Sequence, residues 1–73
     1  MSDLPILRMG SSGDDVVTLQ RFLISQGFDL GEMGADGVYG RRTQEAVRQF
    51  QARAGIDADS VVGPKTYEAI LQV

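Results

Sequence analysis

The sequence of 73 residues contains no cysteine, no histidine and no tryptophan. Without cysteine the chain forms no disulfide and offers no thiolate as a nucleophile or as a zinc ligand. Without histidine it lacks the side chain that most often acts as a general base and most often binds metals. These absences predict a protein that is not an enzyme and that holds neither a metal nor another cofactor.

Positive charge is also in short supply, because 7 Lys and Arg stand against 10 Asp and Glu and give a net charge of −3. Proteins that bind nucleic acid normally carry a basic excess, so no nucleic-acid partner is expected. No apolar run approaches the ~20 residues that span a bilayer, and residues 1–5 do not combine a basic segment with an apolar one. We therefore expect neither membrane insertion nor a signal peptide in this chain.

A chain of this length fits one small domain, and it buries only about 60% of the surface that its unfolded form exposes. A hydrophobic fraction of 42% and a charged fraction of 23% are typical of globular chains. We expect a single domain over residues 1–73, with residues 1–5 as a flexible lead, and a monomer.

Apolar residues recur at the helical period in three segments that glycines separate. The segments cover residues 14–26, 41–54 and 64–72. They predict an all-α fold, a small three-helix bundle, with residues 4–9 as an extended N-terminal lead that lies against it. The candidate core consists of apolar residues on the inner faces and in the loops: Leu7, Val16, Leu19, Leu23, Phe28, Val38, Val47, Phe50, Ile56, Val61, Ile70 and, at its edge, Leu71.

The ends of the predicted helices carry their own signals. Ser12 is a candidate N-cap for the first helix, because its hydroxyl can accept a hydrogen bond from a first-turn amide. Gly27 and Gly55 each precede an apolar residue, which predicts a left-handed stop followed by a side chain that folds back on the helix.

The second and third helices follow loops of the same pattern, repeated at a constant offset (59 − 36 = 23 and 66 − 43 = 23). Residues 36–40, Asp-Gly-Val-Tyr-Gly, align with residues 59–63, Asp-Ser-Val-Val-Gly, and Thr43 aligns with Thr66. The aspartate can accept hydrogen bonds from amides of its own turn, and the final glycine lets the chain turn sharply into the helix. The internal repeat therefore predicts two equivalent turns that close a core against the first helix.

Taken in order, these motifs resemble the bacterial peptidoglycan-binding domain type 1 family, a small helical module attached to cell-wall hydrolases. The resemblance covers about residues 7–71, and Ser60 departs from it, since the family often has glycine there. The motifs that carry it are Leu7-Arg8-Met9-Gly10, Leu19-Gln20, Gly27-Phe28, Asp36-Gly37-Val38-Tyr39-Gly40, Thr43, Phe50-Gln51, Gly55-Ile56 and Val62-Gly63-Pro64-Lys65-Thr66.

The resemblance implies a peptidoglycan-binding-like fold and a non-catalytic module that binds the glycan strand or the stem peptide of the bacterial wall. It implies that such a module targets an attached or partner cell-wall hydrolase, and that it works in the cell wall, in the periplasm or outside the cell as part of an exported protein. The alternative is a protein-interaction or prodomain-like module that has the same fold without glycan binding. The prodomains of matrix metalloproteinases act through a cysteine, which this sequence lacks.

The start of the second helix is the candidate ligand site, because two arginines there can form paired hydrogen bonds with a carboxylate. Stem peptides and muramic-acid lactyl groups carry such carboxylates, and the equivalent turn of the third helix offers only Lys65. The loop over residues 29–35 is expected to form one wall of a shallow groove. The candidate ligand-binding residues are Asp36, Tyr39, Arg41, Arg42 and Gln44.

Structural roles for the same residues remain open. The two arginines can instead pair with Asp36 or Glu45 on a solvated surface, and Tyr39 can pack between loop and helix rather than stack on a sugar or peptide. Gln20 and Gln51 flank the apolar stripes of their helices, and we expect them to bond with neighbouring loop backbone.

Two carboxylate patterns suggest other chemistry but do not support it. Asp57, Asp59 and Glu68 fall on ligand positions of a calcium-binding loop, yet valines occupy the positions of another ligand and of an obligatory glycine. Asp14 and Asp15 are adjacent at a helix start, so they cannot face one another as an acid–base pair. Neither calcium binding nor acid–base catalysis is predicted.

Overall fold

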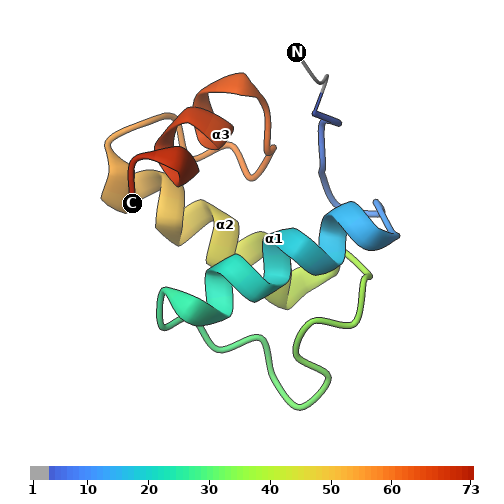
Figure 1. The fold of residues 1–73 in the computed structure, drawn as a ribbon. Coiled ribbons are helices and arrows are strands. Elements are labelled where there is room, and N and C mark those ends of the chain that lie inside the picture. The colour runs from blue at the N-terminus through green and yellow to red at the C-terminus, as the bar shows by residue number, and fades with distance from the viewer. Residues whose placement is uncertain (1–3) are drawn as a thin grey trace.

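The computed structural model describes residues 4–73, which contain three helices (Figure 1). They are α1 (Asp14–Ser25), α2 (Arg41–Ala54) and α3 (Pro64–Leu71). Helix α2 packs against both α1 and α3, so it is the central element of the bundle. The all-α three-helix fold is confirmed, and the predicted helices over 14–26, 41–54 and 64–72 are correct except for one residue at two of the C-terminal ends.

The N-terminal lead lies against the bundle as predicted, and together with the two residues after it, it joins the two halves of the repeat. Leu7 and Val62 exchange backbone hydrogen bonds of 3.1 and 2.8 Å. Further along, Gly10 N–H donates to the carbonyl of Tyr39 at 3.0 Å, and Tyr39 N–H donates to the carbonyl of Ser11 at 2.9 Å. Tyr39 and Val62 occupy equivalent positions of the repeat, so one strand-like segment fixes both turns. Of the flexible lead predicted over residues 1–5, residues 1–3 lie outside the described part of the chain.

The apolar core lies between the three helices and the lead. Two core predictions are wrong, because Val38 is 56% exposed and Leu71 is 82% exposed, whereas Phe28, Ile56, Val61 and Ile70 lie half-buried at the core's edge. The buried apolar side chains are those of Leu7, Val16, Leu19, Leu23, Leu30, Tyr39, Ala46, Val47, Phe50 and Val62.

The two errors have simple geometric causes. Successive side chains of an extended segment point to opposite sides, so burying Tyr39 turns its neighbour Val38 outward. Leu71 follows Ile70 on α3 and is therefore rotated by about 100° from the face that packs on the core.

The glycines predicted to end helices do so, whereas the serine predicted to cap the start of α1 does not. The N-cap of α1 is Gly13, and no side chain caps it, because Ser12 lies one residue earlier in a backbone bridge with Val38. At the other end Gly27 has a φ of 95°, and Phe28 N–H donates to the carbonyl of Leu23 at 3.1 Å. This is the predicted left-handed stop, and Gly55 and Ile56 repeat it after α2.

Candidate functional site

A buried amide side chain holds the turn before α2, residues 36–40, which is called the first turn below. Gln20, on α1, is 1% exposed, and its Nε2 lies 3.1 Å from Asp36 Oδ1, 3.0 Å from the carbonyl oxygen of Val38 and 3.0 Å from Thr43 Oγ1. In return Gly37 N–H donates to Gln20 Oε1 at 2.8 Å. Because an amide group carries two hydrogens, Nε2 shares them among three acceptors. The side chain thus ties α1, the loop and the start of α2 together.

The turn before α3, residues 59–63, is the second turn and repeats this arrangement. Gln51, on α2, is fully buried, and its Nε2 lies 3.1 Å from Asp59 Oδ1, 3.0 Å from the carbonyl oxygen of Val61 and 3.0 Å from Thr66 Oγ1. Ser60 N–H donates to Gln51 Oε1 at 2.9 Å. The prediction that both glutamines bond with loop backbone is confirmed, and the internal repeat extends to these two hydrogen-bond networks.

Asp36 holds its own turn as the sequence predicts. Its Oδ1 accepts a hydrogen bond from Val38 N–H at 3.0 Å, in addition to the one from Gln20. The hydrogen bond from Val38 and then that from Gln20 hold the pKa of Asp36 below its usual value, since both stabilise the carboxylate. Asp59 plays the same part in the second turn, where Val61 N–H donates to it at 3.0 Å.

An open groove of about 500 Å³ lies between the loop before the first turn and the start of α2. Its wall includes Leu30 and Gly31, which confirms that the loop over 29–35 borders a groove. Asp36, Arg41 and Arg42 of the predicted site line this groove.

The other two predicted site residues lie elsewhere. Tyr39 is 1% exposed, and its hydroxyl donates to the carbonyl of Ser60 in the second turn. Burial, with a smaller contribution from the charge of Asp59, raises the pKa of Tyr39 to about 12. Its ring is therefore a core side chain and is not available to stack on a ligand. Gln44 is half-buried on α2 and is not part of the groove lining.

The two groove arginines form no ion pair within residues 4–73, although Glu32 and Asp36 line the same groove. Within residues 4–73 the one ion pair joins Arg48 to Glu45, so Glu45 is engaged elsewhere. Arg42 instead lies against the loop: a Cβ added to Gly31 would come within 2.8 Å of Arg42 Cδ and Nε. Composition gave no signal for this contact, because Gly31 is one of several loop glycines. A ligand carboxylate thus has access to two exposed guanidinium groups.

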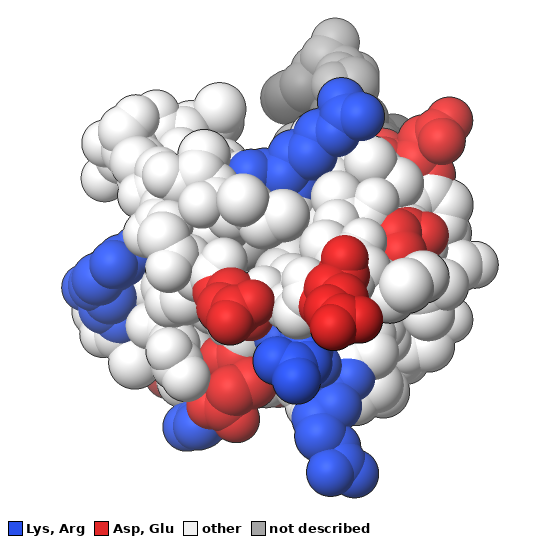
Figure 2. Space-filling view, turned by 90° about the horizontal axis from the view of Figure 1, so that it is seen from below, with Lys and Arg blue, Asp and Glu red and all other residues white. Residues whose placement is uncertain are grey.

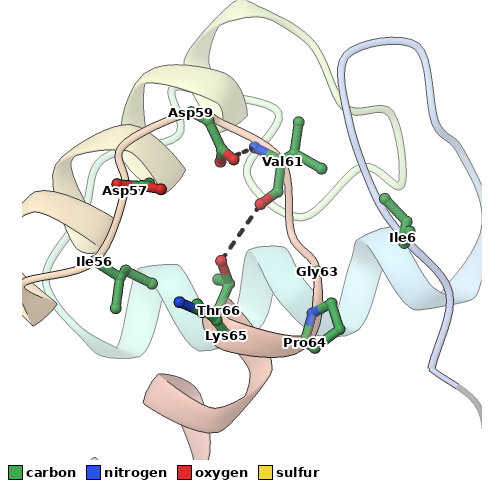
Figure 3. A pocket seen from close by; sticks show the side chains of 9 residues that line it. All are labelled: Ile6, Ile56, Asp57, Asp59, Val61, Gly63, Pro64, Lys65 and Thr66. Atoms are coloured by element: carbon green, nitrogen blue, oxygen red, sulfur yellow. Dashed lines mark hydrogen bonds between the residues drawn. The ribbon is translucent and has the colours of Figure 1, made fainter.

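A smaller cavity of about 270 Å³ occupies the equivalent place before α3 (Figure 3). Its lining repeats that of the groove at the aspartate, valine, glycine and threonine positions of the repeat. Where the groove has Arg41 and Arg42, this cavity has Pro64 and Lys65, and Ile6 from the lead forms part of its wall. The two halves of the repeat therefore line their cavities with the same four residue types but differ in the charged side chains beside them.

Charge on the surface of the molecule is mixed. Figure 2 shows a face on which basic and acidic side chains are interspersed. In the described part of the chain, no three metal-ligating side chains gather into a metal site. No helix formed by residues 4–73 has the length and apolar character needed to cross a bilayer.

Comparison with known proteins gives consistent matches. Residues 12–70 match the family described as "Putative peptidoglycan binding domain". The N-acetylmuramoyl-L-alanine amidase CwlL of Bacillus licheniformis is 44% identical over 68 residues, which are 93% of this chain and 19% of the amidase. The spore cortex-lytic enzyme of Bacillus subtilis is 42% identical over 67 residues, which are 90% of this chain and 21% of that enzyme. The chain thus spans about a fifth of these relatives.

Solved structures agree with the sequence matches. The SleB N-terminal domain superimposes with a TM-score of 0.87 at 36% identity, and the match covers 96% of this chain and 93% of that one. The Burkholderia AP3 phage endolysin gives a TM-score of 0.83 at 44% identity, covering 90% of this chain and 24% of the endolysin.

Proposed function

Because the chain belongs to the peptidoglycan-binding domain family, we propose that it is a non-catalytic module that binds bacterial peptidoglycan and holds an attached cell-wall enzyme on it. The relatives that contain this domain are named as an amidase and as spore cortex-lytic enzymes, and the domain is only part of each. Tethering raises the local concentration of the enzyme at its substrate, so a modest intrinsic affinity is sufficient. The module would then work at the wall, outside the cytoplasm.

The observation that carries the proposal is the groove beside α2. Its two guanidinium groups lie at the rim of an open cavity and have no acidic partner within residues 4–73. A guanidinium group offers a planar pair of donors that fits a carboxylate, which makes the carboxylates of stem peptides and lactyl groups suitable ligands. Asp36 accepts hydrogen bonds from Gln20 Nε2 and Val38 N–H, and Gln20 Oε1 accepts one from Gly37 N–H, so the turn that borders the groove is held in place before a ligand arrives.

The same geometry supports a role without catalysis. Asp36 is an exposed carboxylate whose pKa lies below its usual value, so it stays ionised near neutral pH. A general acid requires the opposite, a carboxyl group whose pKa is raised by burial. Its hydrogen bonds to Val38 and Gln20 also give Asp36 a structural task in the turn.

Co-sedimentation with purified, protein-free sacculi tests the proposal. The parent should pellet with the sacculi, and the double substitution Arg41→Ala with Arg42→Ala should weaken binding by at least about tenfold, since two charge-assisted contacts are lost. Arg8→Ala with Arg21→Ala is the matched control, because it removes the same charge from exposed positions of the N-terminal lead and α1 outside the groove. That control should bind like the parent.

Both double variants should have the same free energy of unfolding as the parent to within about 1 kcal/mol, because all four arginines are exposed. Equal loss of binding in the two variants would show a nonspecific effect of charge and would refute the groove. A parent that sediments only when a partner enzyme is present would favour a protein-interaction module on the same fold.

A further inference from the structure

We propose that Gly31 is a positioning residue for the ligand site, because the absence of a side chain there lets Arg42 lie against the loop with its guanidinium at the rim of the groove. This inference rests on the proposed function, since the guanidinium is positioned for the same ligand carboxylate. It adds a residue outside the predicted site and gives the loop over 29–35 a defined task.

The contact leaves no room for a side chain on Gly31. A Cβ built there would lie 2.8 Å from Arg42 Cδ, 2.8 Å from Arg42 Nε and 3.2 Å from Arg42 Cζ. Real Cβ atoms essentially never approach other heavy atoms more closely than 3.0 Å. The outer half of the Arg42 side chain therefore occupies the space that any other residue at position 31 would need.

The loop is the fixed partner in this contact. Gly31 N–H donates to Asp29 Oδ1 at 2.7 Å, and the carbonyl of Gly31 accepts a hydrogen bond from Gly34 N–H at 3.2 Å. Leu30 is 6% exposed and anchors the loop in the core. A side chain added to Gly31 would therefore displace the exposed end of Arg42 and leave the loop in place.

Restraint of Arg42 before binding has a direct consequence for affinity. A long, mobile side chain loses rotamer freedom when a ligand fixes it, and a side chain that is already held loses less. Within residues 4–73 Arg42 makes no ion pair, so its packing on Gly31 is the restraint that the structure provides. Releasing Arg42 should weaken binding by about three- to tenfold.

The second half of the repeat lacks this device. Lys65 stands at the position equivalent to Arg42, but only residues 57–58 separate the stop after α2 from Asp59, whereas residues 29–35 precede Asp36. The longer connection is thus what supplies the wall on which Arg42 lies.

The substitution Gly31→Ala tests the inference, with Gly55→Ala as the matched control. Both glycines have nearly the same positive φ, 82° and 78°, so both substitutions strain the backbone to a similar extent. A Cβ on Gly55 would meet no neighbouring heavy atom within 4 Å, and Gly55 follows α2 outside the groove lining. Binding to sacculi should fall by about three- to tenfold in Gly31→Ala and stay at the parent level in Gly55→Ala, measured at a temperature where far-UV circular dichroism shows both folded.

Two further measurements separate positioning from general damage. In an Arg42→Ala background, Gly31→Ala should cause no additional loss of binding, because its effect passes through that arginine. In the free protein, the ¹⁵N heteronuclear NOE of Arg42 Nε should fall in Gly31→Ala and stay at the parent value in Gly55→Ala. An unchanged NOE in Gly31→Ala, or an equal loss of binding in both backgrounds, would overturn the inference.

Failure of the inference and failure of the proposed function give different results. If the parent does not sediment with sacculi, the proposed function is wrong and the positioning role falls with it. If the parent binds and Arg42→Ala weakens binding, but Gly31→Ala binds as well as Gly55→Ala, only the positioning role is wrong.

Discussion

Replacing the buried amide of Gln20 by a carboxyl group, Gln20→Glu, tests whether this side chain holds the first turn in place. The substitution preserves shape but exchanges the donor Nε2 for an oxygen, which faces Asp36 Oδ1 at 3.1 Å and the carbonyl oxygen of Val38 at 3.0 Å. Two donated hydrogen bonds, each contributing about 0.5–1.5 kcal/mol, are lost, although the carbonyl of Val38 keeps the hydrogen bond from Gly40 N–H. A buried carboxylate placed against the carboxylate of Asp36 costs at least about 1–3 kcal/mol more. The free energy of unfolding should fall by about 3 kcal/mol or more at pH 7.

A loss of this size is large for so small a domain, whose total stability is expected to be about 4–11 kcal/mol. It should also depend on pH with a defined sign. Burial and the carboxylate of Asp36 should raise the pKa of the introduced group above its unfolded value of about 4.3. A raised pKa favours the folded state while the group is protonated and disfavours it as the pH rises, so the difference from the parent should shrink toward pH 5.

Urea denaturation followed by far-UV circular dichroism at pH 7 and pH 5 measures both effects. The control Gln72→Glu makes the same chemical change at an exposed residue after α3 and should alter stability by less than about 0.5 kcal/mol. If Gln20→Glu destabilises the protein by less than about 1 kcal/mol, or by the same amount at both pH values, the network around Gln20 does not have the strength assigned to it.

Two further predictions concern Ser60, in the second turn, and its hydrogen bond with Tyr39. Ser60→Gly should raise the free energy of unfolding by about 0.5–1 kcal/mol. Ser60 has a φ of 65°, which costs an L-residue about 1–2 kcal/mol, but glycine also increases the conformational entropy of the unfolded chain and so offsets part of the gain. A lower melting temperature would contradict this. Tyr39→Phe should cost about 1 kcal/mol at pH 7, because the hydrogen bond to the carbonyl of Ser60 is lost. Since burial raises the pKa of Tyr39 from 10.0 to about 12, the parent should lose stability as the pH rises through that interval, and the phenylalanine variant should show a smaller loss in urea melts.

The bundle is largely predictable from the sequence because its signals are local. Glycine stops such as Gly27 and Gly55 end helices through their own backbone conformation, and the apolar period of each helix needs no knowledge of its partners. The repeated turns are predictable for the same reason, since Asp36 and Asp59 bond to amides two residues ahead.

Contacts between distant segments explain the errors. Alternation in the first turn does not reveal whether Val38 or Tyr39 faces inward. Backbone hydrogen bonds with residues 10 and 11, which follow the N-terminal lead, hold Tyr39 in its buried position. The same choice removes Tyr39 from the candidate site, whereas Asp36, Arg41 and Arg42 stay in it because the turn places them at the groove.

The wall of the groove was only partly predictable. The length of the loop over 29–35 indicates that this loop forms a wall beside the first turn. No helical or strand periodicity in the sequence marks Leu30 as a core residue. The contact between Gly31 and Arg42 joins residues on different elements, and only their positions in space show it.

The central claim is that the groove arginines bind carboxylates of peptidoglycan, and chemical blocking of those carboxylates tests it most directly. Sacculi whose carboxyl groups have been coupled to a neutral amine are compared with untreated sacculi in the sedimentation assay, with the parent and with Arg41→Ala, Arg42→Ala. The account predicts that blocking lowers binding of the parent to the level of the double variant and leaves the double variant unaffected. A parent that binds blocked and untreated sacculi equally well would contradict it.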